Sequence, residues 1–277
     1  MRPGRLAFSA FLGLASLLTF AFLFVPVASI FGRIPPREIW DQLDTKVVQD
    51  ALRISIEVNG LALLLLLVVG TPASYFLATR RFPGRAVVIT ILELPLVLPP
   101  AVAGIGLLVA FLPDGPIGRL LHPLGYDVVF RESAVVISVL FVGSPFYLRA
   151  AIAAFQGLDE DMLAAARTLG ANPRRVFMRV AIPLAMPGLG AGAALAFARG
   201  VGEFGATIMF AGNLPGVTQT LPLAIYSEFE ADLDTSLAIG ALLVVFSGII
   251  LLTVKLLVAW ASSRSNSPFL SVASVSN

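Results

Sequence analysis

The sequence predicts an all-α membrane protein with six transmembrane helices. The first observation is composition: of 277 residues, 57% are of hydrophobic types and only 13% are charged, whereas soluble globular chains carry about 25% charged residues. The second is that six mostly apolar stretches reach the length of about 20 residues that a helix needs to cross a bilayer. Together they exclude an ordinary water-soluble enzyme and a disordered chain, and a net charge of +2 gives no indication of nucleic-acid binding.

The spans are expected at about 6–31, 55–79, 86–112, 133–155, 184–211 and 236–261. The first contains no charged residue over 26 positions. Because the apolar core of a signal peptide has only about 7–15 residues, this span is expected to be an uncleaved helix. Residues 1–262 are expected to form a single transmembrane domain, followed by a disordered, Ser-rich cytoplasmic tail at 263–277.

The later spans are apolar on all sides, as a bilayer helix should be, and they contain few charges. These charges are Glu57 in the second span, Glu93 in the third, Arg149 in the fourth, Arg199 and Glu203 in the fifth and Lys255 in the sixth.

Loop charges predict the orientation, because cytoplasmic loops are rich in Lys and Arg. With the N-terminus inside, the cytoplasmic loops include Arg80 and Arg81 after the second span and Arg174 and Arg175 after the fourth. The last outer loop, 212–235, contains no basic residue. Both termini are therefore expected in the cytoplasm.

The chain offers little material for catalysis or metal binding. It has no cysteine, and its one histidine, His122, cannot build a metal site alone. Its two lysines, Lys46 and Lys255, do not lie in a phosphate-binding loop of the G-x-x-x-x-G-K-[ST] type. We therefore expect no catalytic residue, no metal ligand and no bound cofactor, so that any ATP would be hydrolysed by a partner.

The loop at 157–183, between the fourth and fifth spans, is the most informative segment. Asp159 is a good N-cap for a short helix, and Gly170 suits the left-handed position after its last turn. Asn172 followed by Pro173 predicts the start of a second short helix. Pro183 is expected to mark the entry to the fifth span.

This loop resembles the coupling loop of permease subunits of binding-protein-dependent ABC importers. Their pattern is E-A-A, three residues, Gly, nine residues and I-x-L-P, although the leading Glu is an alanine here. The matching positions are Ala164, Ala165, Ala166, Gly170, Val180, Ile182 and Pro183. The resemblance implies a type I ABC importer permease fold and docking of this loop into a cytoplasmic ATPase subunit that uses ATP and Mg²⁺. It also implies an extracytoplasmic oxyanion-binding protein, a second copy of the chain and a bacterial or archaeal cytoplasmic membrane.

Two further segments, 94–106 and 202–226, are similar to molybdate transport permeases. The sulfate/thiosulfate permeases, which commonly have Tyr where Phe204 stands, and the tungstate permeases are close relatives. The resemblance therefore favours molybdate and leaves sulfate, thiosulfate and tungstate as alternatives.

Charged residues and prolines within the spans are candidates for lining a translocation path. Pro99 and Pro100 interrupt the third span, and a helix broken in a bilayer needs protein or water to satisfy its freed carbonyls. Glu93 precedes them, and Arg199 and Glu203 lie four residues apart in the fifth span. The structural alternatives are a packed kink and an ion pair that locks the bundle.

Two other classes of protein compete with an ABC permease. An ion-coupled secondary transporter could use the intramembrane charges, but it should show paired repeats, which this sequence lacks. An intramembrane enzyme would have few pairs of nucleophile and base to use.

Overall fold

The computed structural model describes residues 3–265, with side chains from 8 to 256. All regular elements in this range are helical. The α-helices are α1 Pro3–Arg33, α2 Pro36–Asp41, α3 Lys46–Leu65, α4 Thr71–Thr79, α5 Arg85–Val97, α6 Pro100–Phe111, α7 Gly118–Leu121, α8 Glu132–Gln156, α9 Glu160–Thr168, α10 Pro173–Val176, α11 Ile182–Val201, α12 Gly205–Ala211, α13 Leu221–Ala231 and α14 Leu233–Ser265. Five continuous helical stretches are long and apolar enough to cross a membrane, and a bent pair supplies a sixth.

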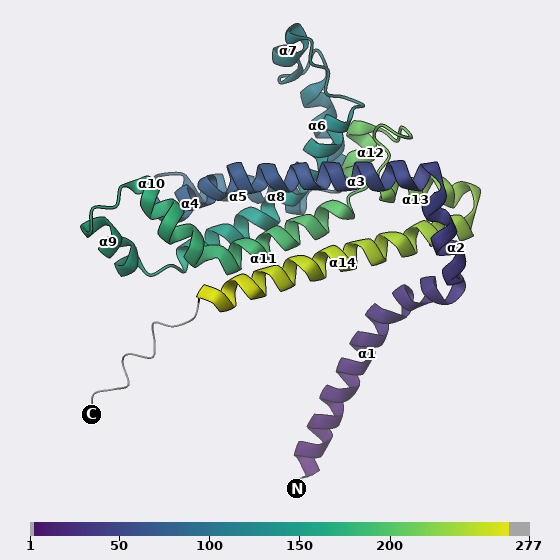
Figure 1. Ribbon diagram of the computed structural model, residues 1–277, viewed down its shortest axis with the longest axis horizontal. Coiled ribbons are helices and arrows are strands. Elements are labelled where there is room, and N and C mark those ends of the chain that lie inside the picture. The colour runs from purple at the N-terminus through teal and green to yellow at the C-terminus, as the bar shows by residue number, and fades with distance from the viewer. Residues whose placement is uncertain (1–2, 266–277) are drawn as a thin grey trace.

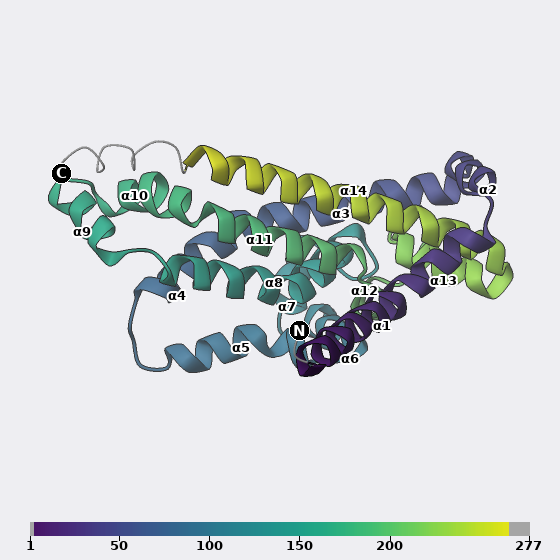
Figure 2. The ribbon, with the colours of Figure 1, turned by 90° about the horizontal axis from the view of Figure 1, so that it is seen from below.

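Helix α8 is the centre of the bundle, where α3, α4 and α11 pack against it (Figure 2). Its Tyr147 is fully buried, and the hydroxyl lies 2.6 Å from Thr71 Oγ1. Small residues let α11 approach closely: a Cβ on Gly192 would lie 2.8 Å from Ala150 Cβ. The fourth span was predicted at 133–155, and the structure confirms a helix there.

Helix α1 leaves the bundle at an angle (Figure 1), and none of its apolar window is buried within this chain. Its C-terminal end is tied to α14, because Arg33 Nε lies 3.1 Å from Asp234 Oδ1. Ile34, directly after α1, is buried at 2% exposure. The first span is therefore a helix, as predicted, and its C-terminal end contacts α14.

The second and fifth spans begin earlier than predicted. Helical structure runs without a break from Lys46 to Thr79 and from Pro173 to Val201. Pro183 therefore lies within a continuous helical stretch, in the first turn of α11, and its place at the entry to the membrane stays a prediction. One π-helical turn, 66–70, lies just before Pro72, and another, 177–181, lies just before Pro183. The wider turn gives room for a ring that would otherwise collide with the carbonyl four residues earlier.

The third and fifth predicted spans are not single helices. α5 and α6 meet at an angle of 115° at Leu98 and Pro99, so the third span is a bent pair. The fifth predicted span, 184–211, ends as α11 at Val201 and resumes as α12 after a three-residue break. The sixth runs over Leu233–Ser265. The first three residues of the predicted tail thus continue α14, and 266–277 lie outside the described residues.

The two ends of the bundle carry different segments. α9 and α10 lie at one end, together with the C-terminal end of α14, whereas α2 and α13 lie at the opposite end (Figure 1). α6 and α7 project sideways from the bundle. The segment 157–183 is thus separated from the acidic stretch Glu228–Asp234 by the length of the bundle.

Candidate functional site

Helix α9 is capped at both ends by the residues that the sequence predicts, Asp159 and Gly170. Asp161 N donates to Asp159 Oδ1 at 2.8 Å, which is a side-chain N-cap. At the other end Gly170 has φ +82°, and its N–H donates to Arg167 O at 2.9 Å, while Ala171 N donates to Ala166 O at 3.1 Å. These two bonds form a Schellman motif, which needs a left-handed residue at the glycine position.

The second helix of this segment starts as predicted but continues into the membrane span. Arg175 N donates to Asn172 Oδ1 at 2.9 Å, and Pro173 occupies the first helical position. Val176 and Ala181 are buried at 1% and 0% exposure in the same core cluster as α8. α9 therefore connects through one tight turn to a continuous helical stretch of 29 residues.

The predicted coupling residues divide into an exposed group and a packed group. Ala164, Ala165, Gly170 and Pro183 are exposed, whereas Ala166, Val180 and Ile182 pack partly against the core. Leu163 anchors α9 at 5% exposure.

Leu169 is the residue of this segment that sequence reasoning missed. It is 88% exposed at the tip between α9 and Gly170. No local pattern in the sequence predicts this exposure, because burial depends on which distant segments pack against the turn. The segment thus exposes small residues and Leu169 at its surface.

The break in the fifth span is built around a buried ion pair. Arg199 Nη2 lies 2.6 Å from Glu203 Oε2, and the Glu203 side chain is fully buried. Glu203 lies just beyond the end of α11, and its Oε1 accepts from Ala206 N at 2.7 Å. The carboxylate thus neutralises Arg199 and caps α12, where the helix dipole favours an anion. This geometry gives the pair a structural role, while 28% of the Arg199 side chain stays exposed.

The bend at Pro99 and Pro100 lies against this break. A Cβ on Gly205 would come within 2.7 Å of Pro100 Cβ. A Cβ on Gly104 would come within 2.6 Å of Ala206 O. The absence of both side chains lets α6 and α12 pack with their backbones in close contact. The two interruptions of the spans therefore meet at one place, which the sequence alone did not indicate.

Glu93 has a partner that sequence reasoning missed. Its Oε1 lies 3.1 Å from Arg149 Nε, which ties α5 to α8. The signal was that each residue is the single charge within its own predicted span. The structure therefore gives Glu93 a different partner from the Arg199–Glu203 pair.

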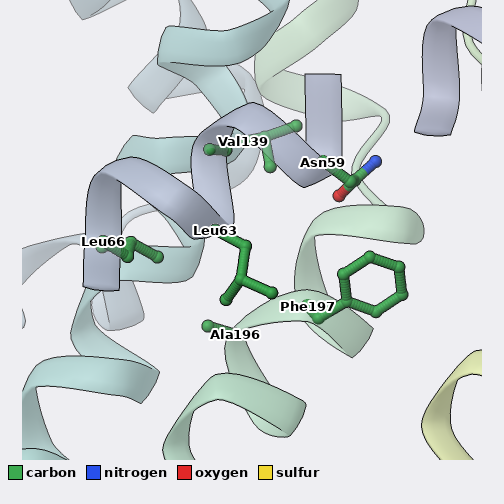
Figure 3. Close-up of a pocket in the computed structure, with 7 residues that line it drawn as sticks. Asn59, Leu63, Leu66, Val139, Ala196 and Phe197 are labelled. Atoms are coloured by element: carbon green, nitrogen blue, oxygen red, sulfur yellow. The ribbon is translucent and has the colours of Figure 1, made fainter. Parts of the chain in front are cut away.

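Asn59 is a second residue that the sequence analysis did not identify as a candidate. It is 4% exposed in α3, and its Nδ2 donates to Ser55 O at 2.8 Å. Its Oδ1 has no hydrogen-bond partner and points toward a small cavity that Leu63, Val139 and Phe197 also line (Figure 3). The buried amide therefore lies between α3 and α11. It faces Gly200, which directly follows Arg199 in the chain.

The outer side of the break carries an aromatic pair. The rings of Phe204 and Tyr226 lie 5.2 Å apart, which joins the start of α12 to α13. A hydrogen bond to the Glu230 carboxylate, together with its charge, raises the pKa of the Tyr226 phenol.

His122, to which the sequence assigns no role, lies 2.8 Å from Asp127 in an exposed loop. Among the described residues, no group of three or more His, Cys, Asp and Glu side chains could hold a metal ion.

Comparison with known proteins adds independent findings. Residues 70–264 match the family described as binding-protein-dependent transport system inner membrane component. The molybdenum transport system permease protein ModB of Mycobacterium bovis is 40% identical over 235 residues, which are 84% of this chain and 88% of the relative. The protein of the same name from Escherichia coli K12 is 41% identical over 181 residues, 65% of this chain and 79% of that protein.

A solved structure has the same fold. A chain in the crystal structure of a bacterial alginate ABC transporter, in complex with its alginate pentasaccharide-bound periplasmic protein, matches with a TM-score of 0.72. The alignment covers 95% of this chain and 96% of the other at 18% identity, so it concerns the fold alone.

Proposed function

We propose that this chain, which belongs to the family of binding-protein-dependent transport system inner membrane components, is the membrane-spanning subunit of a molybdate importer. The observation that supports molybdate as the substrate is the 40% identity to a molybdenum transport permease over most of both chains. The relatives support molybdate over sulfate and thiosulfate. Tungstate has the same charge and shape as molybdate, so the transport experiment must distinguish these two anions.

ATP hydrolysis takes place in a separate cytoplasmic subunit, and α9 transmits it to the spans. The support is geometric: α9 is capped at both ends, exposes Ala164, Ala165 and Leu169, and anchors Leu163 in the core. A helix with small outer residues can enter a protein cleft with its backbone close to the wall. The rigid helix Pro173–Val201 then connects movement of α9 to the break at Gly202–Phe204.

The end of the bundle that carries α9 faces the cytoplasm, and both termini lie on that side of a bacterial or archaeal cytoplasmic membrane. The opposite end receives an extracytoplasmic binding protein. Its acidic residues Glu228, Glu230, Asp232 and Asp234 offer charge for that contact. Two copies of the chain form the path between them, as a symmetric pair.

The path passes the place where the two helix breaks meet. Pro99 and Pro100 free backbone groups there, and Arg199 keeps part of its guanidinium exposed. The exposed part of the Arg199 guanidinium offers hydrogen-bond donors to an oxyanion, while Glu203, which neutralises its charge, limits how tightly the anion is held. Moderate attraction is what transport requires, because a tightly bound anion would not leave.

The test is reconstitution of the complete complex in proteoliposomes. We expect the ATPase rate to rise when the binding protein is loaded with molybdate, and molybdate to accumulate inside. If sulfate stimulates the ATPase and molybdate does not, the chain is a sulfate permease. If tungstate and molybdate give equal responses, the substrates include both anions. Uptake without the ATPase subunit, driven by an ion gradient, would replace the proposal with a secondary transporter.

A further inference from the structure

A second polar site adjoins α9 on the side of the loop between α4 and α5. A pocket of about 630 Å³ lies between the ends of α4 and α8 and the face of α9 that carries Leu163. Its charged lining residues are Arg80, Arg81, Arg85, Arg167, Glu160 and Asp161. The lining therefore carries a net charge of +2, with the loop arginines and the first turn of α9 on separate segments.

The arginines of the pocket are without ionic partners. Within the part of the chain whose side chains are described, none of the four guanidinium groups lies within 4.0 Å of a carboxylate. Arg85 is held in place, because its Nε donates to Leu77 O at 2.6 Å. Arg80, Arg81 and Arg167 therefore present unpaired donors to the pocket, and a guanidinium binds phosphate through two parallel hydrogen bonds.

The position of the pocket indicates what can enter it. Arg80–Gly84 is the short connection between α4, which ends one span, and α5, which begins the next. It must therefore lie at the membrane surface, at the depth of lipid headgroups. Ala78 and Leu158, both partly exposed, supply apolar lining beside the arginines, which an acyl chain can contact. Basic pockets between helices on the cytoplasmic side are typical sites for anionic headgroups.

We propose that this pocket binds phosphatidylglycerol, with the lipid phosphate held by Arg80 and Arg81. Glu160 and Asp161 select this headgroup, because their oxygens accept hydrogen bonds from its glycerol hydroxyls and repel a free dianion. Phosphatidylcholine has no hydroxyl donor and no net charge, so it fits less well. The lipid joins the loop between α4 and α5 to α9. If α9 is the coupling helix of the proposed function, the bound lipid also steadies the element that docks to the ATPase.

Native mass spectrometry of the purified full-length chain measures the binding directly and does not depend on transport. The chain is titrated with phosphatidylglycerol or phosphatidylcholine in detergent. We expect a clear preference for phosphatidylglycerol, and a loss of roughly 30-fold in Arg80→Gln/Arg81→Gln, since each basic residue near the surface contributes about five-fold. Equal binding of both lipids, or unchanged binding in the variant, would overturn the proposal.

Two further variants separate the pocket from general charge and from misfolding. Arg174→Gln/Arg175→Gln removes the same charge from exposed positions outside the pocket, and it should keep its lipid preference. Arg80→Lys/Arg81→Lys retains the charge but loses the planar fork, so we expect intermediate binding. Titration with inorganic phosphate tests the other source of the same chemistry: phosphate that binds as tightly as the lipid would show a free-anion site and refute the lipid proposal.

Discussion

Gly200 of α11 faces Asn59 of α3 so closely that a Cβ on the glycine would lie 2.5 Å from Asn59 Oδ1. The same Cβ would lie 2.8 Å from Val139 Cγ1 on α8. Three helices therefore meet at this glycine, next to Arg199. A side chain here therefore requires the side chains of Asn59 and Val139, or the helices that carry them, to shift.

Gly200→Ala is expected to destabilise the protein by about 1–3 kcal/mol, which is typical of overpacking in a core. Thermal unfolding in detergent measures it. Gly60→Ala, at an open neighbouring position of α3, serves as the control and should not destabilise. Adding Asn59→Ala should restore part of the loss, because one of the two collisions then disappears. A double variant no more stable than Gly200→Ala would show that Asn59 is not the obstacle.

Arg199→Gln should cost about 3–5 kcal/mol, because it leaves the buried Glu203 carboxylate without its counter-charge. Folding yield and thermal unfolding measure this loss. Arg199→Gln/Glu203→Gln removes both charges and should recover most of the stability. Lys255→Gln, at an exposed position, is the control for loss of one positive charge. Transport by the double variant then decides the role: full activity would make the pair purely structural, and low activity in a stable protein would support a path role for Arg199.

Exchange of the charges of Glu93 and Arg149 tests whether their contact joins α5 to α8. Each single reversal, Glu93→Arg or Arg149→Glu, places like charges together and should lower the thermal stability by about 1 kcal/mol or more. The double exchange restores opposite charges and should recover stability. Because both side chains are partly exposed, the effect should also shrink at high salt. Additive losses in the double variant would contradict a direct contact.

Local features of the segment 157–183 could be predicted from the sequence. Asp159, Gly170 and Asn172 act through backbone atoms a few residues away, so their spacing determines the caps. The approximate positions of the spans were predictable for a similar reason, since length and apolar composition are properties of one segment.

Features that depend on distant segments could not be predicted in the same way. The partner of Glu93 is 56 positions away in the sequence, and no local pattern indicates it. Proline predicts an interruption near residue 99 but not its angle of 115°, which depends on the packing of Gly104 and Gly205 against neighbouring helices. The π turns before Pro72 and Pro183 likewise let helices continue where proline alone favours an end.

Asp232 caps α14, and its pKa gives the cap a defined dependence on pH. Hydrogen bonds from the Thr235 hydroxyl and the Asp234 N–H hold the pKa of Asp232 below its ordinary value. A carboxyl with a lower pKa in the folded state adds stability above its unfolded pKa and loses that contribution as the pH falls through its folded pKa. Asp232→Asn should therefore lower Tm slightly at neutral pH, and its difference from the parent should vanish well below pH 4. Asp114→Asn, in an exposed loop, is the control, and a difference independent of pH would contradict this mechanism.

Position 170 requires a left-handed backbone conformation, but it has room for a side chain. A Cβ at this position would meet no atom within 4 Å, yet φ is +82°. The cost of a side chain is therefore backbone strain alone, about 1–2 kcal/mol for an ordinary residue, and it is smaller for Asn, which tolerates the left-handed region. Such a cost cannot unfold the spans, but it can change the angle at which α9 leaves the turn.

Gly170→Ala should therefore keep normal membrane abundance while it weakens ATPase retention and uncouples hydrolysis from uptake. Gly170→Asn should be milder, although its side chain is larger, because the conformation and not the volume determines the effect. Gly157→Ala, at a glycine with φ −80°, is the control outside the turn. Co-purification of the ATPase subunit and anion uptake are measured for all three variants. If Asn disrupts coupling more than Ala, bulk in the docking cleft and not backbone strain controls this position, and if neither has an effect, α9 is not the coupling element.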